Sequence, residues 1–113
     1  MTANEYQQQT MRTAKGVCAE SERALLVQGV MGLCGEAGEC IDLVKKHIYQ
    51  GKKLDKEHLA KELGDVAWYL ATTAEAIGYD LETILEMNIA KCLARYPNGF
   101  EVARSENRAK GDI

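Results

Sequence analysis

The chain has 113 residues, of which 46% are hydrophobic and 27% are charged, a composition typical of one compact globular domain. Its formal net charge of −3 argues against a nucleic acid polymer as the partner, because domains that bind nucleic acid are usually basic. We identify no secretory signal and expect no membrane-crossing segment, so we expect a cytoplasmic protein.

Four helices are predicted in chain order. Ala, Leu, Glu, Lys and Gln are frequent and there is one proline, which favours helix throughout. Asp55 and Asp80 are favourable N-caps for the third and fourth helices, and Gly51 and Gly78 suit the ends of the second and third. The predicted helices cover residues 2–14, 21 or 24 to 49, 56–77 and 81–95, with a loop over residues 15–23.

A turn over residues 97–99, Pro-Asn-Gly, ends the last of these helices. We assign residues 1–100 to one domain and residues 101–113 to a polar, loosely held tail. The predicted fold is therefore all-α, with four helices in the protomer.

The second helix is apolar almost all round between Ala24 and Leu33. A helix of this kind is usually buried on all sides, and a chain this short has few helices with which to surround it. We therefore predict a homo-oligomer; the alternative is burial inside a four-helix protomer. Cys34 and Cys40 lie in the same apolar stretch and are expected to be small buried side chains. No Cys-x-x-Cys pair occurs, so zinc is not predicted.

Two acidic pairs stand inside apolar helical sequence. Glu36 and Glu39 are the only charged residues between positions 24 and 40, and Asp65 is the only one between 63 and 74. Glu62 lies three residues before Asp65, and this spacing puts both carboxylates on one helix face. Buried carboxylates need a compensating partner, and no Lys or Arg is expected to supply one on this face.

Four carboxylates in one cleft would favour Mg²⁺, or alternatively Mn²⁺, both of which prefer oxygen ligands. The predicted turn between the second and third helices does not by itself bring the two pairs into register, which requires the second helix to end early or the connection to fold back. Two solvated acidic faces are the competing interpretation. A di-iron bundle would need Glu-x-x-His motifs, which are absent from the sequence.

Three ordered blocks of sequence resemble the MazG-like nucleotide pyrophosphohydrolases of the all-α NTP pyrophosphatase superfamily. The first two blocks, residues 32–42 and 61–70, contain the acidic pairs as Glu-x-x-Glu and Glu-x-x-Asp. The third, residues 88–100, contains Asn-x-x-Lys followed by Arg-Tyr-Pro. The opening residues 5–13 also resemble the small stand-alone members of the family.

The resemblance implies Mg²⁺-dependent cleavage of a nucleoside triphosphate, NTP or dNTP, between its α- and β-phosphates. Products would be the monophosphate and pyrophosphate, and the protein would assemble as a dimer or tetramer. Small members occur in phages, in which case the location would be the host cytoplasm. By this resemblance the metal ligands are Glu36, Glu39, Glu62 and Asp65, with Glu39 or Glu36 also acting on the attacking water, and the substrate contacts are Tyr69, Asn88, Lys91, Arg95 and Tyr96.

Each assignment has a competing interpretation. Lys91 and Arg95 would also fit an exposed face that balances nearby glutamates, and Trp68 is more typical of a core residue than of a platform for a base. The whole chain would also fit a non-catalytic helical module that binds a nucleotide or a partner helix. Phosphoribosyl-ATP cleavage is a further activity within the superfamily.

Overall fold

The computed structural model describes residues 1–18 and 21–113. The described residues form helices and no strand, which confirms the all-α prediction. The helices are α1 (Ala3–Cys18), α2 (Glu22–Gln50), α3 (Lys56–Ala76), α4 (Leu81–Arg95) and α5 (Val102–Glu106). The chain divides into two compact units, Met1–Leu81 and Glu82–Ile113, and each is described by itself.

Local capping explains where α2 and α3 begin and end. The Ser21 hydroxyl accepts the Ala24 backbone N–H at 3.0 Å, and the Asp55 carboxylate accepts the His58 N–H at 3.0 Å. Each cap satisfies an N–H group that the first helical turn leaves without a partner. Gly51 ends α2 with a φ of 67°, and its N–H donates to the Lys46 carbonyl. This left-handed conformation is one that glycine adopts without steric cost.

The first helix is longer than predicted. α1 continues to Cys18, so the expected end at residue 14 and the loop from residue 15 are wrong over residues 15–18; residues 19 and 20 of that loop lie outside the described residues. Ala14 is fully buried in the core, which anchors the helix at the predicted end. The single Gly16 that follows costs a helix only about 1 kcal/mol, too little to stop it there.

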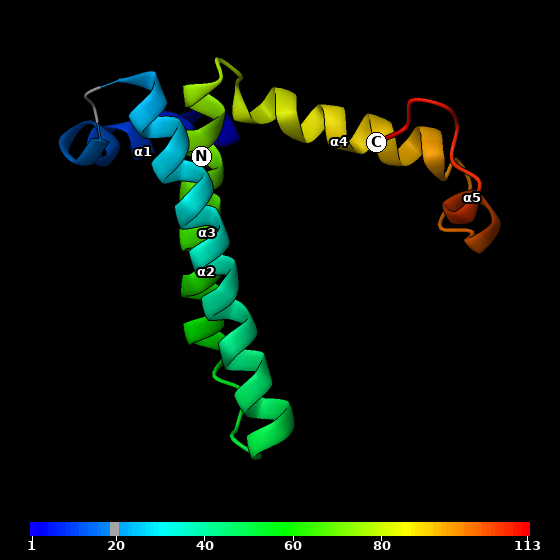
Figure 1. Cartoon of the computed structure of the whole chain (residues 1–113), viewed down its shortest axis with the longest axis horizontal. Helices are drawn as coiled ribbons and strands as arrows, with labels where there is room; N and C mark the ends of the chain where they lie inside the picture. The colour runs from blue at the N-terminus through cyan, green and yellow to red at the C-terminus, as the bar shows by residue number, and fades with distance from the viewer. Residues whose placement is uncertain (19–20) are drawn as a thin grey trace. The chain divides into compact units, whose positions relative to one another are not determined.

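α2 and α3 form an antiparallel pair and run side by side along most of α3 (Figure 1). Two glycines of α2 permit the close approach: a Cβ at Gly29 would clash with Thr73, and a Cβ at Gly32 would clash with the Tyr69 ring. α1 packs mainly on α3 and also on α2. The core around Ala14 and Leu25 is completed by Met11, Trp68 and Ala76, so the interpretation of Trp68 as a core residue is confirmed.

A buried glutamine ties α1 to the end of α3. The Gln7 side chain is 3% exposed. Its amide donates to the carbonyls of Tyr79 at 2.9 Å and Ala71 at 3.5 Å, and its oxygen accepts the Leu81 N–H at 2.7 Å. These bonds satisfy backbone groups at the turn around Gly78, which a glycine with φ 78° makes possible. Sequence periodicity did not identify this contact.

Much of α2 remains exposed within one chain. Only Leu25 and Gly29 of α2 are buried, whereas Val30, Met31, Ile41 and Ile48 are 46–69% exposed. The helices of the first unit therefore do not bury α2 on all sides, and both the homo-oligomer and burial inside a four-helix protomer stay predictions. Cys34 is exposed as well, so its expected burial is wrong for the single chain. Helical periodicity marks an apolar face but does not say which molecule covers it.

By length and composition α2 also qualifies as a membrane-crossing helix, which corrects the expectation that no such segment exists. Core helices of soluble proteins pass the same test. α2 carries Glu36 and Glu39 in its middle, and a charged side chain at the centre of a bilayer costs about 2.5 kcal/mol or more. A protein without a membrane partner stays our prediction.

The second unit contains the rest of α4, the turn after it and α5. A fifth helix within residues 101–113 was not predicted. The segment after it is also attached, because the Asp112 carboxylate accepts two hydrogen bonds from Arg95 at 2.8 and 2.6 Å. The expectation of a loosely held tail is therefore wrong, since it missed a pairing across 17 residues. The division into a domain of residues 1–100 and a tail stays a prediction.

Candidate metal and nucleotide site

Glu36 meets the second acidic pair because the connection between α2 and α3 folds back along the end of α2. The Lys52 N–H donates to the Lys46 carbonyl at 3.3 Å, and the Lys52 carbonyl lies 2.8 Å from Nδ1 of His47. α3 therefore starts beside the last turns of α2 and not beyond them. In this register Gly32 faces Tyr69, and Glu36, one turn further along α2, faces Glu62 and Asp65, one to two turns earlier on α3.

Three carboxylates converge at this point of the hairpin. One oxygen each from Glu36, Glu62 and Asp65 lies within 4.8 Å of the others. Glu36 and Glu62 are partly buried and Asp65 is exposed, so the expected burial is only partial for the first two and is not found for Asp65. Glu39 lies outside this group and is exposed. The structure thus brings together three of the four predicted ligands.

The pKa of Glu36 shows that the converging carboxylates repel one another. Partial desolvation raises the pKa of Glu36, and a hydrogen bond with Glu62 raises it further. The negative charges of Asp65, Glu62 and Glu39 also raise this pKa. Like charges this close favour a proton or a cation between them. No ion pair among the described residues joins a Lys or Arg to any of the three carboxylates.

The donor set fits a hard divalent cation. All three groups are carboxylates, the ligand type that Mg²⁺ and Mn²⁺ prefer. Opposite ligands of an octahedral Mg²⁺ ion lie about 4.2 Å apart, so small side-chain rotations would let oxygens now within 4.8 Å of one another contact one ion. Three protein ligands would leave coordination positions for water and for substrate phosphate.

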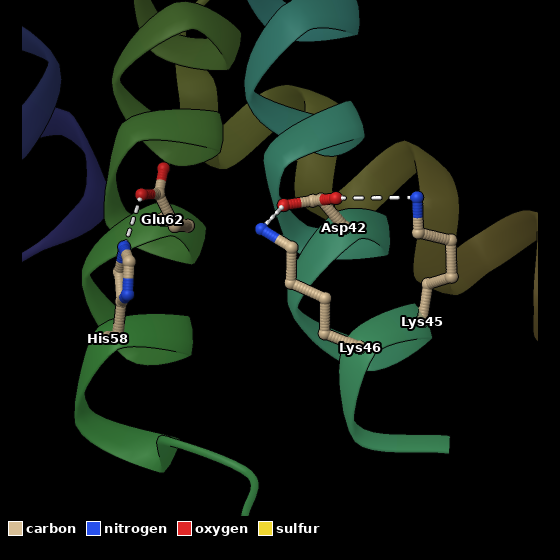
Figure 2. Close-up of polar contacts among 5 residues, drawn as sticks. All are labelled: Asp42, Lys45, Lys46, His58 and Glu62. Carbon is tan, nitrogen blue, oxygen red and sulfur yellow. Dashed lines mark hydrogen bonds and ion pairs between the residues drawn. The ribbon is translucent and has the colours of Figure 1, made fainter. Parts of the chain in front are cut away.

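Two side chains next to the carboxylates were missed by the sequence analysis. Nε2 of His58 lies 3.0 Å from a Glu62 oxygen, one turn earlier on α3 (Figure 2). The Tyr6 hydroxyl donates to the Gly64 carbonyl at 3.4 Å, and its pKa is raised by desolvation and by the Asp65 charge. The i to i+4 spacing of His58 and Glu62 was a usable signal. The contact from Tyr6 to α3 spans 58 residues and had no signal in the sequence.

Figure 2 also shows a contrasting arrangement on α2, where Asp42 lies 2.6 Å from Lys46 and 3.6 Å from Lys45. The hydrogen bond from Lys46 lowers the pKa of Asp42. This acid has its countercharges on its own helix. Asp42 is therefore satisfied as an ion pair with two lysines, whereas no Lys or Arg among the described residues pairs with the three converging carboxylates, of which Glu62 contacts His58.

The predicted substrate contacts occupy both units. Tyr69, from α3, packs its ring against Gly32 and edge-on against Trp68 at 5.1 Å between centroids. Asn88, Lys91, Arg95 and Tyr96 belong to the second unit. There Arg95 pairs with Asp112 and lies over the Tyr96 ring at 5.9 Å. The proposed pairing of Arg95 with nearby glutamates is not what the structure shows. The roles of these residues toward a substrate stay predictions.

Comparison with known proteins identifies the family of the chain. The family model of the MazG nucleotide pyrophosphohydrolase domain matches residues 28–100, a range that contains all four predicted metal ligands. The chain therefore belongs to the MazG nucleotide pyrophosphohydrolase domain family.

The chain is similar in sequence to a protein of a phage. The Gene 37 protein of Mycobacterium phage L5 is 35% identical over 82 residues, which cover 69% of this chain and 72% of that protein. No solved structure matches the chain.

Proposed function

We propose that the protein is a divalent-metal-dependent nucleoside triphosphate pyrophosphohydrolase, with Mg²⁺ as the metal and Mn²⁺ as a substitute. The substrate is an NTP or dNTP, cleaved between the α- and β-phosphates to the monophosphate and pyrophosphate. The observation that carries the proposal is the convergence of Glu36, Glu62 and Asp65 from two helices, in a chain of the MazG domain family.

The three converging carboxylates would hold the metal. When bound, Mg²⁺ neutralises phosphate charge and lowers the pKa of a coordinated water. Glu39 lies one turn from Glu36 on α2, outside the converging group and exposed, and is therefore available to orient a water and accept its proton. Water adds to phosphorus, the bridging P–O bond between the α- and β-phosphates breaks, and pyrophosphate leaves with the electron pair. His58 holds Glu62 in place through its 3.0 Å contact.

The remaining predicted contacts would position the nucleotide. Tyr69 lies one turn beyond Asp65 on α3 and would contact the sugar or base, while Lys91 and Arg95 would contact phosphates, with Asn88 and Tyr96 beside them. We place this activity in the cytoplasm, in the host cell if a phage encodes the chain. The exposed apolar side of α2 supports assembly as a dimer or tetramer, because an exposed apolar patch of this kind marks an interface.

The proposal is tested by incubating the protein with each common NTP and dNTP in Mg²⁺ and measuring monophosphate, pyrophosphate and orthophosphate separately. We expect equal amounts of monophosphate and pyrophosphate from at least one nucleotide, and none in EDTA. Orthophosphate together with a diphosphate would mean cleavage at a different bond. Tight nucleotide binding without any turnover would identify the non-catalytic module instead.

A further inference from the structure

The second unit contains a cavity of about 510 Å³, between the end of α4, the helix α5 and the segment that follows. The volume lies in the range of sites that enclose small molecules. Five cationic side chains and one acidic side chain line it: Lys91, Arg95, Arg104, Arg108, Lys110 and Asp112. A cavity with this excess of positive charge attracts anions.

Asp112 already occupies part of this cavity as an internal anion. Its carboxylate receives the two hydrogen bonds from Arg95, and the side chains of both residues are no more than 15% exposed. The hydrogen bond from Arg95 lowers the pKa of Asp112, and the charges of Arg95, Arg108 and Lys91 lower it further. Three cations thus surround one carboxylate in the way that they would surround a phosphoryl group.

The Asp112 side chain alone does not neutralise these cations. Lys91 and Arg108 make no ion pair with any carboxylate of the second unit, all of whose residues are described. Arg104 has only a loose contact with Glu101 at 3.7 Å, in which both side chains are about half exposed (48% and 47%). Exposed pairs of this kind contribute little, so this part of the cavity keeps unpaired cationic donors.

We propose that this cavity is a binding pocket for phosphoryl anions, in which Asp112 occupies the place of a phosphate when no ligand is bound. Arg108 and Arg104 add to Lys91 and Arg95 as ligand contacts. A doubly or triply charged phosphate competes for Arg95 because it offers more charge and more acceptor oxygens than one carboxylate. The choice of a nucleotide over free pyrophosphate as the source of the phosphates rests on the proposed function, but the pocket itself does not.

The test is a calorimetric titration of pyrophosphate into the full chain in EDTA, which keeps metal out of the acidic group. We expect Arg108→Gln to weaken binding about 5- to 10-fold, the loss of one charge-assisted hydrogen bond in a partly solvated site. The matched control is Arg12→Gln, because Arg12 is exposed on α1 and only contacts Gln9 at 3.1 Å. That control should bind pyrophosphate as the wild type does.

The variant Asp112→Asn should change the affinity for pyrophosphate in the opposite direction. Removing the competing carboxylate should tighten pyrophosphate binding about 3-fold or more. Equal affinity in the Arg108 and Arg12 variants would overturn the proposal. So would weaker binding in a folded Asp112→Asn protein, or a DNA duplex bound more tightly than pyrophosphate.

Parallel titrations with a nucleoside triphosphate and with the nucleoside separate the two sources of phosphate. Similar affinities for the triphosphate and for pyrophosphate would show that the pocket recognises only the phosphate groups. The nucleoside should not bind, and nucleoside binding as tight as that of the triphosphate would contradict the proposal. Because the assay requires neither metal nor turnover, binding can be found in a protein that lacks hydrolysis, and the two proposals can fail separately.

Discussion

The acidic group of the α2–α3 hairpin and the Arg95–Asp112 pair of the second unit both place charged side chains close together, with opposite results. Arg95 and Asp112 satisfy each other with two short hydrogen bonds. Glu36, Glu62 and Asp65 are charges of one sign, and crowding raises the pKa of Glu36. Two kinds of polar group can thus be distinguished. Groups of the first kind have their charge or hydrogen bonds satisfied within the chain, and groups of the second kind are proposed to bind a ligand. Changes to the first kind should alter stability, and at Arg95 and Asp112 the proposed phosphate binding as well. Changes to the second kind should alter function.

The largest expected effect is on activity at the acidic group. Glu62→Gln removes one predicted metal ligand and should lower Mg²⁺-dependent pyrophosphate release by about 100-fold or more, because even residues that only support metal ligands are worth 10- to 100-fold. The control is Glu57→Gln, since Glu57 is an exposed residue of α3 that pairs with Lys61 at 3.3 Å. Equal activities of the two variants would mean that the acidic group is a surface feature.

The next largest effect is on stability at Gln7, which belongs to the satisfied kind. Gln7→Ala leaves the Leu81 N–H and the Tyr79 carbonyl without their buried partner, which should lower the free energy of unfolding by about 2–3 kcal/mol. Gln8→Ala changes an exposed neighbour and should stay within about 0.5 kcal/mol of the wild type. Urea denaturation of the three proteins measures both effects, and a wild-type midpoint for Gln7→Ala would contradict the role of this amide.

A smaller change in stability tests the close approach that sets the register of the acidic residues. Gly32→Ala puts a methyl group into the Tyr69 ring, and such overpacking costs about 1–3 kcal/mol. Gly35→Ala, one turn away with no atom within 4 Å of its new Cβ, should instead stabilise the helix by up to about 1 kcal/mol. Thermal unfolding that shifts in the same direction for both variants would contradict this helix packing.

The smallest effect is the pH dependence of stability. The raised pKa of Glu36 means that the folded protein holds this proton more tightly than the unfolded chain does. This stability is therefore present at low pH and is lost as the pH rises through the raised pKa. In EDTA, Glu36→Gln should flatten the decline of Tm over that range, by about 2 °C because the group is partly solvated. An unchanged slope would mean that the carboxylates do not interact.

Local signals in the sequence predicted the secondary structure and one side of the site. Caps at Asp55 and Gly51 and the i, i+3 spacing of Glu62 and Asp65 depend on neighbours within a few residues, and these predictions agree with the structure. The approach of Glu36 to this pair spans 26 residues and depends on how α2 and α3 pack. Other contacts join residues that lie 17 to 74 positions apart in the sequence. They are Tyr6 with Asp65, Gln7 with Tyr79 and Leu81, and Arg95 with Asp112. No periodicity encodes such contacts, because they depend on how the helices pack.

Exposure was the other property that the sequence did not reveal. The apolar residues of α2 and the thiol of Cys34 were expected to be buried, and the single chain leaves many of them open. Hydrophobicity measures how favourable burial is, but a second molecule can provide that burial as well as the same chain. Light scattering at micromolar concentration should therefore find a dimer or tetramer, and a monomer would contradict the prediction of a homo-oligomer.

The central claim is that Glu36, Glu62 and Asp65 form a binding site for a divalent cation. Titration of Mn²⁺ into the protein, followed by electron paramagnetic resonance of the free ion, tests it without any assumption about the substrate. We expect saturable Mn²⁺ binding in the wild type, competition by Mg²⁺, and loss of this binding in Asp65→Asn while Glu57→Gln binds as the wild type does. Equal Mn²⁺ binding by folded Asp65→Asn and wild-type protein would contradict the account.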